Sequence, residues 1–296
     1  MTNILRKVLV CLVVLSSVFS TPLFAETGRS VQIKGSDTMV NLGQAWAEAF
    51  MEENPSASIA VTGGGSGTGI AALINGTCNV AESSREMTQK EYEFARAKGL
   101  EVQRVSVGMD ALTFVVHPEN PVSQMTFDQL SDIFTGKIKN WKEVGGKDEP
   151  ILALSRERNS GTHVYVLEEM VRKGKKDGPE EFAPSVLMMP SSQAIEQEVA
   201  DNKSALGYFG LGYLSPKVKA LHILNPKTGQ YAIPNIDSAL DGTYPVSRPL
   251  LFYIAGTPKG ILKEFVDFVL SEKGQAIVLD MHFVPLQKSS SKPAPS

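Results

Sequence analysis

The chain has 296 residues, of which 42% are hydrophobic, and a net charge of −3 at pH 7. This length supports one large lobe or two smaller lobes, each around a buried core. The acidic balance argues against nucleic acid as a partner, because binding to a phosphate backbone requires a basic surface. A protein of this charge that binds a small anion must use local donors rather than a global positive field.

The first 25 residues have the pattern of a secretory signal peptide. Arg6 and Lys7 precede an apolar run from Val8 to Phe19, which is shorter than a usual membrane span. We expect export and cleavage near Ala25. Removal of this segment takes away two basic residues and no acid, so the net charge changes from −3 to −5. It also leaves Cys78 as the one cysteine, which excludes an internal disulfide.

The mature chain begins with a predicted strand–turn–helix unit. Residues 31–34 have the character of a short strand, and apolar residues at helical spacing predict a helix over 40–53. Ser36, Asp37 and Thr38 stand between them, at the start of the helix. Ordinary capping of the helix is one interpretation of this turn. Anion binding at the helix N-terminus is the other.

The second unit contains a glycine-rich stretch over residues 62–70, with the sequence TGGGSGTGI. Glycines allow a ligand to approach the backbone, and the helix that follows offers unpaired N–H groups and the positive end of its dipole. A nucleotide-binding P-loop is excluded, because Ile70 stands where that motif requires lysine. The dinucleotide fingerprint and the hydrolase elbow also fail on spacing. We therefore expect an anion site here, with Ser66 and Gly67 at the helix start and Ser66 at the N-cap position.

A third unit follows over residues 78–98, and Ser83, Ser84 and Arg85 stand at the end of its strand. Strands that alternate with helices predict a parallel sheet with its ligand crevice beyond the carboxyl ends of the strands. The three turns would then lie at one edge of one sheet.

A fourth unit lies in the second half of the chain. A strand over 151–154 and a helix over 164–171 flank a loop that contains Arg156, Arg158 and Ser160. Either arginine can grip an oxyanion with two parallel hydrogen bonds, so the residue pattern leaves both open.

Two apolar stretches near residues 112–117 and 244–250 are expected to join two lobes. Lobe 1 would contain residues 26–116 plus 244–288, lobe 2 residues 117–243, and residues 289–296 would form a disordered tail. The remaining expected elements are a capped helix over 126–134, a possible strand over 186–189, a helix over 191–201, a strand and bend over 205–213, a strand over 244–254 and one or two helices over 262–279.

Six motifs together resemble the periplasmic phosphate-binding proteins of ABC importers, over essentially the whole mature chain. They are Gly35–Thr38, Gly63–Gly69, Phe134–Trp141, Arg156-x-x-x-Ser160-Gly-Thr162, Tyr244–Pro249 and the C-terminal stretch from Gly274 to Leu286. The resemblance implies an α/β, two-lobed, type II binding-protein fold, with a mostly parallel sheet and flanking helices in each lobe and two hinge strands between them. It also implies a periplasmic protein that closes on one phosphate and delivers it to a membrane permease. We expect a monomer that needs no cofactor.

The resemblance further implies which residues bind the phosphate. Thr38 and its neighbours match the first phosphate loop, Ser66 matches the serine of the glycine loop, and Arg156 matches the family arginine. Ser84 departs from the pattern, because many members carry there an aspartate that accepts the phosphate proton. The expected ligand residues are Ser36, Asp37, Thr38, Ser66, Gly67, Ser84, Arg85, Arg156, Ser160, Gly161 and Thr162.

The departure at Ser84 leaves the proton-accepting role to another carboxylate. Asp37 is the candidate nearest to a ligand loop, and Glu82 is the alternative. An acceptor that faces the phosphate proton would reject sulfate, which has no proton to share. Asp37 could instead serve only as a helix cap.

Two other functions remain open at this stage. The ligand could be another oxyanion, such as sulfate or molybdate. The protein could also be an exported phosphate-ester hydrolase with Ser66 or Ser160 as its nucleophile, which would require an adjacent base. His163 is close to Ser160 in sequence, but neighbouring positions on a helix point in different directions. No metal is expected, because the four histidines lack ligand spacing: His117, His163, His222 and His282.

Overall fold

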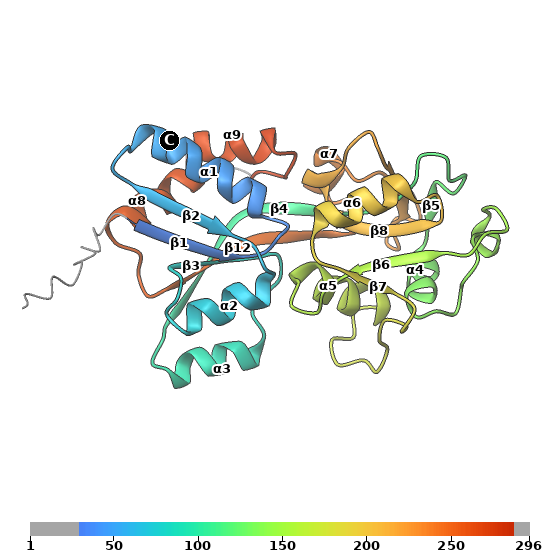
Figure 1. Ribbon diagram of the computed structural model, residues 1–296, viewed down its shortest axis with the longest axis horizontal. Helices are drawn as coiled ribbons and strands as arrows, with labels where there is room; N and C mark the ends of the chain where they lie inside the picture. The colour runs from blue at the N-terminus through green and yellow to red at the C-terminus, as the bar shows by residue number, and fades with distance from the viewer. Residues whose placement is uncertain (1–29, 287–296) are drawn as a thin grey trace, which may run out of the picture.

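The computed structural model describes residues 30–286, which form two lobes (Figure 1). The expected signal peptide, its cleavage near Ala25 and the tail at 289–296 lie outside the described residues. Each lobe has a largely parallel sheet with flanking helices, and two long strands run between the lobes. The two-lobed α/β fold expected from the sequence is confirmed.

Lobe 1 repeats a strand–turn–helix pattern three times. Strand β1 lies between β2 and β3 and pairs with both in parallel. The carboxyl ends of the three strands therefore meet at one edge of the sheet, as expected from the alternation of strands and helices. The elements are β1 (Ser30–Gly35), α1 (Val40–Glu53), β2 (Ser58–Thr62), α2 (Ser66–Ile74), β3 (Val80–Ser83) and α3 (Gln89–Ala97).

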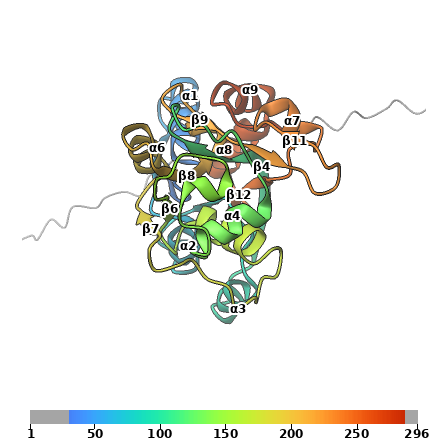
Figure 2. The same cartoon turned by 90° about the vertical axis from the view of Figure 1, so that its right-hand side faces the viewer.

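Helices cover both faces of this sheet. α1, α8 (Gly260–Leu270) and α9 (Glu272–Asp280) lie on one side, and α2 and α3 lie on the other (Figures 1 and 2). The core beneath α1 contains the buried rings of Trp46 and Phe252, which meet edge-on with 5.7 Å between their centroids. Each such fully buried side chain contributes about 1.5–3 kcal/mol to the stability of the lobe.

The two long strands hold the lobes in one continuous sheet. Strand β4 (Val102–Val116) pairs with β12 (Ser247–Ala255) over residues 102–111 and with β8 of lobe 2 over residues 112–116. Its partner changes between Ala111 and Leu112, earlier than the lobe boundary expected at residue 116.

Lobe 2 places β6 between β7 and β8, and all three strands are parallel. The helix expected over 164–171 starts earlier, at Gly161, and its last turn is a π-helix, Leu167–Val171. The larger elements of the lobe are α4 (Phe127–Phe134), β6 (Leu152–Arg156), α5 (Gly161–Val166), β7 (Leu187–Met189), α6 (Ser192–Asp201) and β8 (Ala205–Gly210).

The sequence analysis missed several short elements of lobe 2. Strands of two or three residues carry too little periodicity to be recognised along the chain. They are β5 (Gln124–Met125), β9 (Lys219–Ala220), β10 (His222–Leu224), β11 (Tyr231–Ala232), the 3₁₀ turns Trp141–Val144 and Leu211–Tyr213, and α7 (Ile236–Leu240). Within residues 30–286, no helix combines the length and apolar character needed to cross a membrane.

Candidate functional site

The turns after β1, β2, β3 and β6 meet in the cleft between the lobes. Thr38 Oγ1 of lobe 1 lies 2.9 Å from Thr162 Oγ1 of lobe 2, and both side chains are buried. Asp37 of lobe 1 and Arg156 of lobe 2 are joined by an ion pair of 2.6 Å. The structure therefore brings together the four turns that the sequence analysis singled out.

Three serines from lobe 1 form a buried hydroxyl cluster. Ser36 Oγ donates to Ser84 Oγ at 3.0 Å, and the backbone N–H of Ser84 donates to Ser66 Oγ at 3.1 Å. Gly161 of lobe 2 packs directly on this cluster, because a Cβ atom at that position would lie 2.4 Å from Ser66 Oγ and 2.7 Å from Ser84 Oγ. Only glycine lets the lobe 2 backbone come this close.

The helix starts at the site are capped differently from the sequence expectation. The N-cap of α2 is Gly65, with φ of 91°, so Ser66 is the first helical residue rather than the cap. The N-cap of α1 is Met39, and no side chain caps this helix. The capping interpretation of Asp37 is therefore wrong. Ser160, in contrast, caps α5 by accepting from the backbone N–H groups of Thr162 and His163.

Asp37 uses both carboxylate oxygens within the protein. Oδ1 accepts the backbone N–H of Gly64 at 2.9 Å, and Oδ2 accepts Nη2 of Arg156 at 2.6 Å. The side chain thus ties the glycine loop of lobe 1 to the arginine of lobe 2.

Arg156 is 1% exposed, and the protein occupies most of its donors. Beyond Asp37, the guanidinium donates to the carbonyl oxygens of Met189 and Pro190 and to Ser192 Oγ. Four of its five N–H groups therefore have protein partners. Arg158, the other arginine of this loop, is exposed.

Arg85 lies beside the glycine loop and forms an ion pair with Glu91 of α3. Its Nη1 and Nη2 donate to the two carboxylate oxygens of Glu91 at 2.8 and 2.7 Å. Burial raises the pKa of Glu91, but the hydrogen bonds from Arg85 outweigh it, so the pKa lies below its usual value. The Nε atom of Arg85 is buried and has no partner within residues 30–286.

Glu82 is a fully buried acid beneath the first loop. Neither carboxylate oxygen has a hydrogen-bond partner within residues 30–286. Its Oε1 faces α1, where a Cβ atom on Gly43 would lie 2.3 Å away. Burial, and to a smaller extent the charge of Asp37, raise the pKa of Glu82 well above its ordinary value. Burial therefore favours the neutral form of this carboxyl group over the ionised form.

Two residues at this site received no role from the sequence. Arg248 of β12 donates through Nη2 to Thr162 Oγ1 at 2.9 Å and to Thr38 Oγ1 at 3.4 Å. Asp110 of β4 accepts from Arg248 Nη2 at 2.8 Å and is completely buried. The sequence signal was an acid directly before the mainly apolar run at residues 111–116, since a charge buried beside such a run needs a partner.

Comparison with known proteins identifies the family. The family model described as a PBP superfamily domain matches residues 24–273. The phosphate-binding protein PstS of Bacillus subtilis is 38% identical over 260 residues, which cover 87% of this chain and 81% of that protein. The chain belongs to the PstS family of phosphate-binding proteins.

Other PstS-family relatives agree with this assignment. PstS of Pseudomonas aeruginosa is 32% identical over 269 residues, covering 85% of this chain and 81% of that protein. Among solved structures, a phosphate ABC transporter substrate-binding protein from Clostridium perfringens with bound phosphate superposes with a TM-score of 0.77. It is 31% identical and covers 87% of this chain and all of that one. A phosphate transport receptor from Vibrio cholerae gives a TM-score of 0.69 at 29% identity, covering 86% of this chain and all of that one.

The geometry does not support a hydrolase in this PstS-family chain. His163 Nδ1 lies 3.1 Å from Ser155 Oγ, and its ring packs on Phe182 with centroids 4.7 Å apart. Burial lowers the pKa of His163 to about 4. Within residues 30–286, neither Ser66 nor Ser160 has a side-chain hydrogen bond to an imidazole or a carboxylate. A serine without such a base is not an activated nucleophile.

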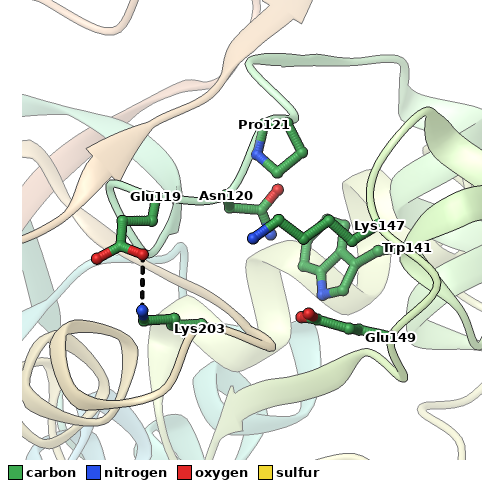
Figure 3. Close-up of a pocket in the computed structure, with 7 residues that line it drawn as sticks. All are labelled: Glu119, Asn120, Pro121, Trp141, Lys147, Glu149 and Lys203. Carbon is green, nitrogen blue, oxygen red and sulfur yellow. Dashed lines mark hydrogen bonds and ion pairs between the residues drawn. The ribbon is translucent and has the colours of Figure 1, made fainter.

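Two cavities lie beside the buried cluster, one on each side. One of about 510 Å³ opens on the side of Arg85, Tyr165 and Arg248, and another of about 320 Å³ opens on the side of Asp37 and Tyr213. A third, of about 10 Å³, lies within lobe 2, away from the four turns (Figure 3). It holds at most one water, so it is no oxyanion site. Its lining residues are Glu119, Asn120, Pro121, Trp141, Lys147, Glu149 and Lys203.

Proposed function

We propose that this protein captures inorganic phosphate between its lobes and delivers it to the permease of an ABC importer. The observation that carries the proposal is the meeting of hydroxyl and backbone donors from both lobes in one buried cluster. Its lobe 1 side contains Ser36, Thr38 and Ser66, and its lobe 2 side contains Gly161 and Thr162. The bound phosphate in the Clostridium perfringens relative supports the same ligand for this chain.

The charges of the site favour binding through hydrogen bonds rather than through net positive charge. Arg85 is paired with Glu91, Arg156 with Asp37 and Arg248 with Asp110, so each guanidinium has its own carboxylate. A hydrogen bond to a charged group contributes about 1.5–3 kcal/mol, and several from both lobes can compensate for the lost hydration of phosphate. A ligand held by both lobes favours the closed state.

The eleven residues expected from the sequence are our proposed ligand shell, in different roles. The hydroxyls and the backbone at Gly161 would contact phosphate, and Asp37 would hold Arg156 in place. The N–H of Gly67 donates to the carbonyl oxygen of Asn159 at 2.9 Å, so Gly67 would join the shell by bringing the lobe 2 loop onto the glycine loop. The two lobes expected from the sequence were residues 26–116 plus 244–288 and residues 117–243. Because β4 changes its partner after Ala111, we propose to move residues 112–116 into lobe 2. The ABC transporter context of the Clostridium perfringens relative supports a permease as the partner. The periplasmic location and the monomeric state belong to the proposal as expectations from the sequence.

Calorimetry tests the proposal. The purified exported protein, stripped of endogenous ligand by reversible unfolding, is titrated with phosphate, sulfate and molybdate. We expect one phosphate per chain and at least tenfold weaker binding of the other anions. Heat with sulfate or molybdate but none with phosphate would assign the site to another oxyanion. Steady phosphate release from a chromogenic monoester, abolished in Ser66→Ala, would show catalysis instead.

A further inference from the structure

Arg248 lies where the two lobes and the joining strands meet. It belongs to β12, whereas Thr38 and Thr162, to which its Nη2 donates, belong to lobe 1 and lobe 2. The two threonine hydroxyls also bond to each other, at 2.9 Å. One guanidinium nitrogen therefore contacts a proposed ligand residue of each lobe.

Asp110 fixes the orientation of this guanidinium. Its Oδ2 accepts from Nε of Arg248 at 3.1 Å and from Nη2 at 2.8 Å, while Oδ1 accepts the backbone N–H of Leu211 at 3.0 Å. The ring of Tyr165 lies on the guanidinium, 5.5 Å from its carbon to the ring centroid. Both joining strands thus contribute one member of a buried ion pair with little rotational freedom.

Residues 30–286 offer no hydrogen-bond partner to the Nη1 atom of Arg248. The atom is buried, and the whole side chain is only 1% exposed. Native proteins seldom leave a buried guanidinium N–H unsatisfied, because its desolvation is not compensated. The same arginine lines the cavity of about 510 Å³ beside the cluster, together with Arg85. An acceptor that enters from this cavity would complete its bonding.

We propose that Arg248 is a direct ligand of the bound oxyanion and that Asp110 is its positioning residue. The inference rests on the proposed function and adds to it a donor that comes from the joining strands. Arg156 already has protein partners for four of its N–H groups, whereas Nη1 of Arg248 has none in the described part of the chain. An oxyanion on Nη1 would be held next to Thr38 and Thr162, so binding would couple both lobes to the strands about which they rotate.

The test compares Arg248→Lys with Arg104→Lys, a matched change at an exposed arginine of the joining strand β4 that pairs with Glu86. Lysine keeps the charge but loses the planar fork that can bond the ligand and Asp110 together. Phosphate Kd is measured by calorimetry, and the unfolding midpoint is measured without phosphate. We expect Arg248→Lys to weaken phosphate binding at least 100-fold and Arg104→Lys to leave it within threefold.

A second variant, Asp110→Asn, decides the matter if Arg248→Lys does not fold. It keeps the arginine and the shape of its partner, and we expect at least tenfold weaker binding. A phosphate Kd within threefold of wild type in the folded variants, even with a lower unfolding midpoint, would assign a purely structural role and overturn the inference. Failure of the proposed function would be distinguishable, because in that case the wild-type protein itself would bind no phosphate. If the wild type binds and Arg156→Ala alone abolishes binding, the function stands while the role of Arg248 falls.

Discussion

Asp37 and Arg156 close the cleft from opposite lobes, with 2.6 Å between Oδ2 and Nη2. The side chain of Asp37 is 17% exposed and that of Arg156 is 1% exposed, so solvent screens the pair only weakly. Both oxygens of Asp37 accept protein donors in this arrangement. This geometry favours Asp37 as a bridge between lobes over Asp37 as the acceptor of a phosphate proton.

We therefore expect Asp37→Asn to open the unliganded protein. The change removes a charged hydrogen bond that only the closed state makes, at a cost to that state of about 1.5–3 kcal/mol. Small-angle scattering without phosphate should show a larger radius of gyration for Asp37→Asn than for wild type. Asp128→Asn, which breaks an exposed pair with Lys173, should leave the radius of gyration unchanged. The ratio of phosphate affinity to sulfate affinity in this variant should stay within threefold of the wild-type ratio. A ratio that falls tenfold or more would restore the proton-accepting role.

Gly161→Ala should prevent full closure. The added Cβ would meet Ser66 Oγ at 2.4 Å and Ser84 Oγ at 2.7 Å, and these hydroxyls are themselves buried and bonded. We expect phosphate binding at least 30-fold weaker, or about 2 kcal/mol, and an unfolding midpoint close to wild type, because the contact lies between lobes. Gly67→Ala is the matched comparison, since its Cβ would lie 3.3 Å from the nearest atom, the Asn159 carbonyl oxygen. Equal losses in the two variants would contradict this account of closure.

Replacement of Arg156 should weaken phosphate binding far more than replacement of Arg158, the other arginine of the lobe 2 loop. Arg156→Ala leaves Asp37 without its partner in the cleft and removes four hydrogen bonds. The closed state then contains an uncompensated carboxylate, so we expect phosphate affinity to fall at least 100-fold, or about 2.8 kcal/mol. Arg158 is exposed, and an exposed charge contributes about 1 kcal/mol or less. Calorimetry on both variants checks this difference, and comparable losses would show that Arg158 also reaches the ligand.

Local patterns predicted the four turns, because each strand, glycine or serine run and helix start is encoded within about a dozen residues. The contacts between the turns were harder to predict. Asp37 and Arg156 are 119 positions apart, and Asp110 and Arg248 are 138 apart. Such pairs depend on strand order and register, which periodicity does not report. Asp110 could have been recognised as an acid next to the mainly apolar run at residues 111–116, but its partner could not have been named.

The burial of Glu82 predicts an unusual dependence of stability on pH. Its pKa is raised in the folded protein, so the folded state holds a proton that the unfolded state releases above about pH 4.5. Folding therefore becomes less favourable as the pH rises from that value toward the folded pKa, by up to about 1.4 kcal/mol per pH unit. Glu82→Gln keeps the shape of the neutral acid and has no proton to lose.

The variant should match wild type near pH 4 and be progressively more stable above it. Urea unfolding at several pH values between 4 and 8 measures the difference directly. His163 does not produce the same trend, because its pKa is lowered to about 4, so its contribution to stability is lost as the pH falls from about 6.5 and is common to both proteins. If the difference between Glu82→Gln and wild type does not change with pH, the pKa of Glu82 is not raised in the folded protein, which would contradict this prediction.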